Sequence, residues 1–253
     1  SVLVVAAGVR PPSPPCPFKP GHTGVATYAR GLDYHAWMGA RLETLAQRVE
    51  ALAGRPVRHH AFCDTTALPE KRLAAAAGLG RIGRHTLLIH PRLGTWVALG
   101  GLLLDLDLPA SSAHRSDCPP TCRRCLDACP THALDGHSLD ARRCMSFWTT
   151  DTERPIPPDI SRALGDCVYG CDACQQACPD NAHAACATHA AFRPLAERAL
   201  PLAALDARTD AALSQWIGGT AMQRGGVERL RRNLRACMSP HDVIVTPPAR
   251  SSR

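Results

Sequence analysis

Two copies of one cysteine pattern constrain this chain more than any other feature. The first copy is Cys118-Pro-Pro-Thr-Cys122-Arg-Arg-Cys125-Leu-Asp-Ala-Cys129-Pro130, and the second is Cys167-Val-Tyr-Gly-Cys171-Asp-Ala-Cys174-Gln-Gln-Ala-Cys178-Pro179. Each contains the spacing CxxCxxxCP, with which a short loop and a helical turn wrap a cubane iron–sulfur cluster while the last cysteine reaches a second cluster. Two such runs predict two clusters, and therefore electron transfer.

This crossed arrangement divides most of the cysteines between two clusters, because three cysteines of one run face one cubane and the cysteine before proline faces the other. One cluster is expected on Cys118, Cys122, Cys125 and Cys178. The second is expected to take three ligands from Cys129, Cys171 and Cys174.

The fourth ligand of the second cluster is open between two cysteines. Cys167 completes the internal repeat, whereas Cys144 stands alone after two arginines; symmetry favours Cys167. Zinc also binds sets of four cysteines built from CxxC pairs. A doubled CxxCxxxCP is much more typical of iron–sulfur binding.

Composition places the chain among globular proteins of a reducing compartment. It has 253 residues, 45% of them apolar, which is enough to bury a substantial core. Its 13 cysteines are odd in number and crowd at metal-ligand spacings, which favours a reducing cytoplasm over a disulfide scaffold. No apolar run approaches the roughly 20 residues that span a bilayer, and no basic segment marks a signal peptide.

The net charge of +7 comes mainly from arginine, which binds phosphate oxygens in pairs. A polyanionic partner such as RNA is therefore permitted. An arginine-for-lysine bias explains the composition equally well.

Hydrophobic periodicity predicts alternating strands and helices before residue 108, which favours an α/β layer. Strands are expected over residues 2–9, 57–62 and 94–104, and helices over 34–53 and 69–77. Cysteine, proline and serine then dominate, and after residue 184 the chain becomes rich in alanine, leucine and arginine at helical spacing. The predicted segments are an α/β domain at 1–108, a double-cluster ferredoxin-like domain at 109–183, a helical region at 184–238 and a disordered tail at 239–253.

Gly78, Gly80 and Gly83 match the spacing GxGxxG of dinucleotide-binding loops only formally. They follow a predicted helix and precede a predicted strand, which is the reverse of the order that such a site requires. A nicotinamide site is not favoured here.

Several stretches together resemble the epoxyqueuosine reductases, cobalamin-dependent iron–sulfur enzymes that complete queuosine in the tRNA wobble position. They occur in family order and cover most of residues 1–238. The stretches are Ala26-Thr-Tyr-Ala-Arg-Gly-Leu-Asp33-Tyr34-His35, Cys63-Asp64-Thr-Thr-Ala-Leu-Pro-Glu70, Ala77-Gly-Leu-Gly-Arg-Ile-Gly-Arg-His-Thr-Leu-Leu-Ile89, Leu139-Asp-Ala-Arg-Arg-Cys144-Met-Ser146, the second cysteine run from Tyr169, Gly218-Gly-Thr-Ala-Met-Gln-Arg224, and Leu230-Arg-Arg-Asn233.

The resemblance implies an enzyme that reduces the epoxide of epoxyqueuosine in tRNA with cob(I)alamin and electrons from two 4Fe-4S clusters. The family's proton-donating acid falls on Asp64, whose pKa burial between a strand and a helix is expected to raise. A helix cap or a local turn is the ordinary alternative role for such an aspartate. The family's lone cysteine after two arginines is the fourth ligand of the second cluster, which favours Cys144 over Cys167.

The resemblance also implies a fold and a set of partners. The fold is an α/β cobalamin-binding layer followed by a double-cluster ferredoxin-like domain and a short α-helical C-terminal region. Tyr34, His35, Gly78, Gly80, Gly83 and Leu88 are similar to parts of the cobalamin pocket, where glycines let the backbone approach the corrin closely. A tRNA substrate, an external electron donor, a cytoplasmic monomer and no membrane are expected.

The chain departs from the family pattern in three places. Three residues separate Cys118 from Cys122, where the family has two. The segment that usually precedes the first strand, and most of the C-terminal helical repeats that help to grip tRNA, fall outside this sequence. Two alternatives therefore stay open: a cobalamin–iron–sulfur reductase of another substrate, related to reductive dehalogenases, and a non-catalytic iron–sulfur electron-transfer protein.

Overall fold

The N-terminal part of the chain builds an antiparallel sheet in the order β1-β6-β3. The computed structural model describes residues 1–11, 21–113, 117–195 and 200–239. β1 (Val2–Gly8) pairs along its whole length with β6 (Val97–Leu104), and β3 (His59–Phe62) pairs with the other side of β6. Gly100 and Gly101 of β6 leave room for Met38, Leu42 and Phe62, because a Cβ at either position would meet these side chains.

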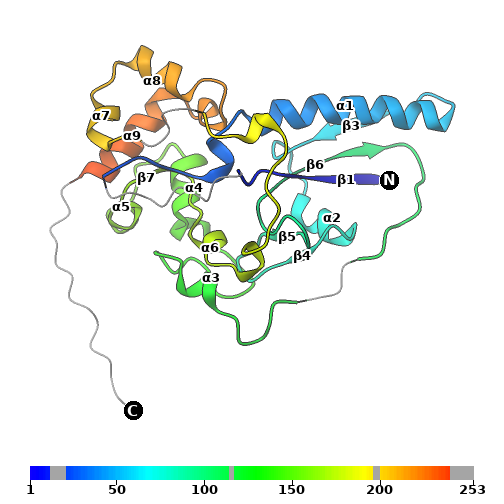
Figure 1. Ribbon diagram of the computed structural model, residues 1–253, viewed down its shortest axis with the longest axis horizontal. Coiled ribbons are helices and arrows are strands. Elements are labelled where there is room, and N and C mark those ends of the chain that lie inside the picture. The colour runs from blue at the N-terminus through cyan, green and yellow to red at the C-terminus, as the bar shows by residue number, and fades with distance from the viewer. Residues whose placement is uncertain (12–20, 114–116, 196–199, 240–253) are drawn as a thin grey trace.

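The long helix α1 (Tyr34–Ala53) lies along the sheet (Figure 1). It begins where the Asp33 side chain accepts a hydrogen bond from the backbone N–H of His35, and it ends at Gly54, whose φ of 64° is left-handed. Its buried side chains Met38, Leu42 and Ala46 pack with residues of β3 and β6 into one hydrophobic cluster.

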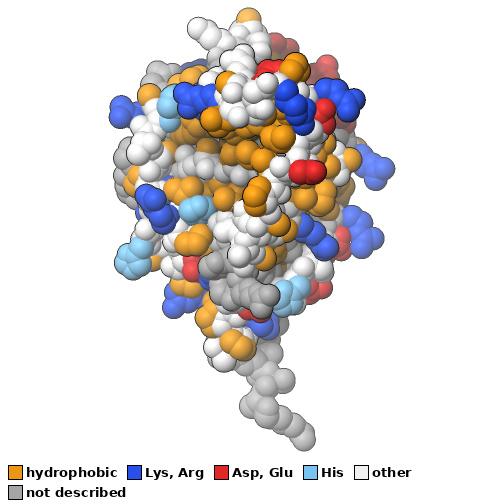
Figure 2. Space-filling view, turned by 90° about the vertical axis from the view of Figure 1, so that its right-hand side faces the viewer, with side chains coloured by type: hydrophobic (Ala, Val, Ile, Leu, Met, Phe, Trp, Pro, Cys, Tyr) orange, Lys and Arg blue, Asp and Glu red, His pale blue; other side chains and the backbone are white. Residues whose placement is uncertain are grey.

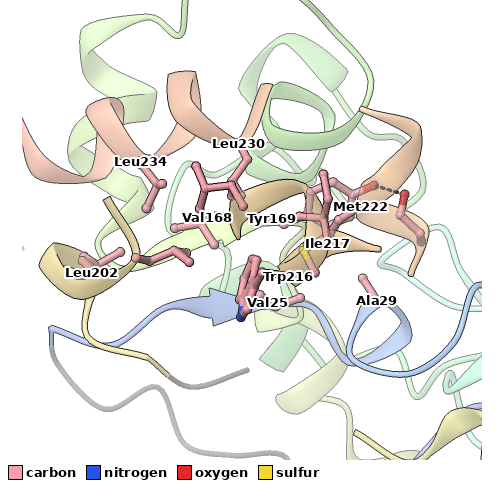
Figure 3. Close-up of a cluster of buried hydrophobic side chains, with 13 residues drawn as sticks. Val25, Ala29, Val168, Tyr169, Leu202, Trp216, Ile217, Met222, Leu230 and Leu234 are labelled. Atoms are coloured by element: carbon pink, nitrogen blue, oxygen red, sulfur yellow. Dashed lines mark hydrogen bonds between the residues drawn. The ribbon is translucent and has the colours of Figure 1, made fainter. Parts of the chain in front are cut away.

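A second hydrophobic cluster joins distant parts of the chain (Figure 3). The short strand β2 (Gly24–Val25) pairs in parallel with β7 (Cys167–Tyr169). Val25 and Val168 pack there against α7 (Leu202–Asp206), α8 (Asp210–Ile217) and α9 (Gly226–Met238). Residues 21–30 therefore connect the C-terminal helices to β7, which contains Cys167 of the second cysteine run.

Asn233 of α9 ties this cluster together. It is fully buried, and its side-chain amide donates to the backbone carbonyls of Thr149 (2.9 Å) and Val168 (2.8 Å). Arg232 donates in turn to the Asn233 side-chain oxygen (2.8 Å). The Arg-Asn dipeptide thus fixes α9 against α4 (Met145–Thr150) and β7.

The cysteine runs occupy short loops and helical turns (Figure 1). The turn α3 (Arg124–Asp127) packs against α6 (Ala173–Gln176), which brings the two copies of the pattern together. The small hairpin of β4 (Arg81–Ile82) and β5 (Leu88–Ile89) lies beside them. The remaining elements are α2 (Glu70–Ala76), α5 (Pro158–Leu164) and the 3-10 turns η1 (Thr27–Ala29), η2 (Ala141–Arg143), η3 (Pro179–Asn181), η4 (Ala190–Phe192) and η5 (Ala221–Arg224).

The strands and helices predicted before residue 108 are present, α1 with the predicted ends and the others with shifted ends, and the C-terminal region is helical as expected. The division into four segments stays a prediction. Both large hydrophobic clusters contain residues from more than one of these segments. Most of the predicted tail, from residue 240 onward, lies outside the described residues. In the described part of the chain, no helix combines the length and the apolar character that a membrane span requires.

The end of the molecule that carries the sheet presents a mixed surface. Figure 2 shows hydrophobic side chains gathered in the upper half of this face, with lysine or arginine side chains around them. β1 forms one edge of the sheet, and its side chains from Leu3 to Ala7 are half-buried.

Candidate functional site: two cysteine sets in two cavities, one shared with an acid

Seven of the eight cysteines of the two runs line two cavities. A small cavity is lined by Cys118, Cys122, Cys125 and Cys178. A much larger cavity of about 610 Å³ is lined by Cys129, Cys144, Cys171 and Cys174, among others. In both sets the cysteine before proline joins three cysteines that the repeat does not place next to it.

The chemistry of these thiols fits an iron–sulfur cluster. Burial raises the pKa of Cys171 and of Cys178 to about 11 each, and it raises the pKa of Cys125 as well. A buried thiolate is unfavourable without a positive partner, and iron atoms coordinated by the sulfurs supply that partner. Side chains arranged around a space, rather than on one point, suit a polynuclear group.

Cys144 and Cys167 occupy different environments. Cys144 lies directly before α4 and lines the larger cavity with Cys129, Cys171 and Cys174. Cys167 is buried in β7, where its thiol donates to the backbone carbonyl of Gly170 (2.7 Å). It is not among the residues that line either cavity, so the geometry favours Cys144 as the fourth ligand of the second set.

The larger cavity lies between the sheet and the second cysteine set. Its walls come from β6, from the loop after β3, from the β4–β5 turn and from the segments around the four cysteines. Its volume is within the range of cofactor and ligand pockets, and Trp96, Leu88 and Leu99 contribute apolar surface. A large flat cofactor would contact both the cysteine set and the sheet in this position.

Asp64 lines the same cavity, on the loop that follows β3. Its φ of 57° is left-handed, a conformation that aspartate tolerates better than most residues and that often occurs at functional sites. Its backbone N–H donates to the Glu70 carboxylate (2.6 Å). Asp64 does not cap α2, whose N-cap is Pro69, so its side chain is free for contacts within the cavity.

Two side chains of α1 meet the Asp64 carboxylate. Tyr34 donates its hydroxyl hydrogen to Asp64 Oδ2 (2.9 Å), and His35 Nε2 lies 3.4 Å from the same oxygen. His35 Nδ1 contacts Asp33 Oδ1 (2.6 Å), and the rings of Tyr34 and His35 stack at 4.0 Å. The two aspartates therefore hold one imidazole between them.

The expected rise in the pKa of Asp64 is not found. The hydrogen bond from His35 lowers the pKa of Asp64, and the Tyr34 hydroxyl adds to this effect, so together they outweigh burial. Burial opposes them and is the second-largest influence on this pKa, although about two thirds of the side chain (66%) is exposed. For His35, burial would lower the pKa, but hydrogen bonds to Asp33 and Asp64 outweigh it and raise the value. The structure thus favours an ionised Asp64 beside an imidazole whose pKa is raised.

The residues predicted to hold cobalamin do not all lie on the cavity. Tyr34 and Leu88 line it, and His35 lies behind Asp64. Gly78, Gly80 and Gly83 are not among the described residues that line it. A Cβ at Gly78 or Gly80 would instead collide with a neighbouring backbone carbonyl, which accounts for glycine there by chain packing alone.

Two residues of this site had no role in the sequence interpretation. Arg224 at the end of η5 reaches His35 Nε2 (2.5 Å), although 189 positions separate them. Glu70 holds the backbone of Asp64. Both lie in the family-like stretches, which was the available signal, but no local spacing connects either residue with His35 or Asp64.

Comparisons with known proteins agree with this arrangement. Residues 118–181 match a 4Fe-4S double cluster binding domain, and residues 1–65 match the family described as epoxyqueuosine reductase QueG, DUF1730. An epoxyqueuosine reductase of Gloeobacter violaceus is 39% identical over 228 residues, which cover 87% of this chain and 70% of that protein. The chain belongs to the epoxyqueuosine reductase family. Another relative of that name, from Xanthomonas campestris pv. campestris, is 41% identical over 83% of this chain and 59% of its own length.

Solved structures of the family share the fold. The epoxyqueuosine reductase of Streptococcus thermophilus superposes with a TM-score of 0.78 at 29% identity, over 93% of this chain and 62% of that one. A crystal structure of epoxyqueuosine reductase with an epoxyqueuosine-modified tRNA stem loop gives a TM-score of 0.81 at 25% identity, over 93% and 63%. This chain spans 59%, 54% and 58% of the lengths of three curated epoxyqueuosine reductases that it matches.

Proposed function

We propose that this protein reduces the epoxide of epoxyqueuosine in tRNA, and so forms queuosine. One observation carries the proposal: Asp64 and the second cysteine set line the same cavity, so an acid and an electron source face one space. The names of the relatives supply the substrate, and one of the similar structures holds an epoxyqueuosine-modified tRNA stem loop.

The cysteines hold two 4Fe-4S clusters. Cys118, Cys122, Cys125 and Cys178 bind the first, and Cys129, Cys144, Cys171 and Cys174 bind the second. Tyr34, Leu88 and Trp96 would hold cobalamin in the larger cavity, where it would supply a nucleophilic cobalt when reduced. The fold is then an α/β cobalamin-binding layer, a double-cluster ferredoxin-like domain, and helices that brace the cluster domain.

Reduction of the epoxide to an alkene takes two electrons and two protons and releases the oxygen as water. The electrons come through the cysteine sets from an external donor. The developing oxyanion needs a proton at the position that Asp64 faces. Asp64 is ionised at rest and the pKa of His35 is raised, so a proton taken up by this pair reaches the substrate through the Asp64 carboxyl.

Each neighbour of Asp64 then has a defined task. Tyr34 orients the carboxylate through Oδ2, and Glu70 holds the left-handed backbone that points it into the cavity. Asp33 fixes the His35 ring through Nδ1. The Arg224 guanidinium stabilises the two carboxylates and limits how basic the imidazole becomes.

The substrate reaches the cavity past basic side chains. Lys71 and Arg72 are exposed and line the cavity at the start of α2, where they are available to phosphate groups. A tRNA substrate implies a cytoplasmic location. We also infer that the chain acts as a monomer.

The deciding experiment uses anaerobically reconstituted protein with cobalamin, a low-potential reductant and tRNA that carries epoxyqueuosine, with the nucleoside read by mass spectrometry. Queuosine should form, and Asp64→Asn should abolish turnover with both clusters intact. Asp107→Asn, at an exposed position outside the cavity, is the matched control and should behave like the unaltered protein. Iron without corrin binding would favour a carrier protein, and corrin binding without any queuosine would favour another substrate.

A further inference from the structure

His85 occupies the turn of the β4–β5 hairpin and lines both cavities. The turn is closed by a hydrogen bond from the Gly83 N–H to the Leu87 carbonyl (2.9 Å). Only 3% of His85 is exposed. The ring is thus enclosed between the first cysteine set and the larger cavity, and Asp64 and its partners make no use of it.

The hydrogen bonds of the turn determine which ring nitrogen carries the proton. The Leu87 N–H donates to His85 Nδ1 (3.2 Å), so this nitrogen accepts through its lone pair and carries no hydrogen. Burial lowers the pKa of His85 to about 4, which keeps the ring neutral near pH 7. A neutral imidazole whose Nδ1 accepts must carry its hydrogen on Nε2.

That Nε2–H has no acceptor among the described residues, and it is shielded from solvent. A buried donor without a partner destabilises a protein. Such groups are rare in native structures, and each calls for an explanation such as an unseen ion or cofactor. A group that enters one of the two cavities removes the penalty if it presents an acceptor to Nε2.

Other donors of the same hairpin already face the first cysteine set. Arg81 donates through its terminal nitrogen to the carboxylate of Asp180 (2.8 Å), which lines the small cavity. Arg84 donates to the backbone carbonyl of Cys122 (3.0 Å). The hairpin therefore presents donors to this set, and the sulfurs of a bound cluster are acceptors at the position that the small cavity occupies.

We propose that His85 donates a hydrogen bond from Nε2 to a sulfur of the cluster held by Cys118, Cys122, Cys125 and Cys178, and thereby raises the reduction potential of that cluster. The inference rests on the proposed binding of two clusters. Reduction adds one electron to the cluster, increases the negative charge on its sulfurs and strengthens the hydrogen bond, while the proton stays on His85. Hydrogen bonds to the sulfurs are among the factors that set cluster potentials.

The test is a redox titration of the reconstituted protein, followed by electron paramagnetic resonance. His85→Leu removes the donor at similar volume, and His85→Gln keeps an N–H donor. With His85→Leu the equilibrium constant for reduction of one cluster should fall about tenfold, so its reduction potential should fall by about 59 mV for one electron. His85→Gln should recover most of the shift. His60→Leu replaces an exposed histidine on β3 and should change neither potential.

Two further measurements make each outcome decisive. Cys144→Ser perturbs the second site and so assigns the two waves of the titration; a shift confined to the second cluster would overturn the inference, as would unchanged potentials in His85→Leu. If His85→Leu does not assemble, unaltered protein with ¹⁵N-labelled histidine decides: pulsed spectroscopy of the reduced first cluster should detect a coupled nitrogen, and its absence would refute the contact. Absence of iron from unaltered protein would remove the cluster proposal itself, a result distinct from intact clusters with unshifted potentials.

Discussion

The choice between Cys144 and Cys167 offers the sharpest test of the proposed clusters. Cys144→Ser removes a sulfur that lines the larger cavity with three other cysteines. The second cluster would then be left with three thiolates, whereas the first set, around its separate cavity, is untouched. Unaltered protein should hold about eight iron atoms, and the Cys144→Ser variant about four.

Cys167→Ser is the matched variant, and its expected effect on iron is nil. The thiol of Cys167 donates to the Gly170 carbonyl inside the protein, and a serine hydroxyl can make the same hydrogen bond. Replacing a buried sulfur with oxygen should lower the free energy of unfolding by about 1 kcal/mol. This loss is too small to release a cluster bound by four other cysteines.

The assay is iron content per chain after anaerobic reconstitution, together with the visible absorbance of the clusters. Cys171→Ser should match Cys144→Ser, since both cysteines line the same cavity. Half of the iron missing from Cys167→Ser, with full iron in Cys144→Ser, would refute the reasoning and support the symmetric reading of the repeat. Zinc in place of iron in all variants would refute the cluster assignment altogether.

Three other outcomes are expected. The pKa of His35 is raised, so this side chain should keep its proton to a higher pH than a free histidine and lose it as the pH rises. Asp33→Asn removes the carboxylate that stabilises the charged ring, and should move the loss of turnover at alkaline pH to a lower pH. If the pH of this loss does not change, the pair does not hold the proton. Asn233→Leu leaves two buried carbonyls unpaired, and should lower the free energy of unfolding by about 3 kcal/mol and the melting temperature by roughly 6–12 °C, whereas exposed Arg235→Ala should do neither. Leu68→Trp narrows the larger cavity and should weaken cobalamin binding, read from its visible spectrum, with iron content unchanged; equal affinity would place the corrin elsewhere.

Local sequence patterns were enough to predict many of the helices and strands. The extent of α1 follows from the cap at Asp33, the spacing of its apolar residues and the left-handed Gly54, all of which act within one or two turns. The strand at Val2–Gly8 follows from a short apolar run that ends before prolines. The pairing of β2 with β7 had no such signal, because two short strands 143 positions apart meet only when the helices around them pack.

The glycine-rich stretch was assigned to the cobalamin pocket, but the fold gives two of its glycines a different role. Similarity to the family suggested that these glycines approach a cofactor. In the fold, Gly78 and Gly80 make room for the chain's own backbone, and the same hairpin turns His85 toward the cysteines. The sequence gives the position of each glycine, but it does not show which group packs against that glycine in the fold.

Two cysteine sets and a crossing between them could be predicted from the sequence alone, because the spacing of ligands along a loop and one helical turn is local geometry. The resemblance already favoured Cys144 over Cys167, and the tertiary structure supplies the physical reason, since Cys144 lines a cavity and Cys167 is buried in a strand. Only the tertiary structure reversed the expected shift in the pKa of Asp64, because that shift depends on Tyr34 and His35, which α1 brings from about thirty positions away. Spacing along the chain specifies what neighbours in sequence can bind, whereas charge and burial depend on neighbours in space.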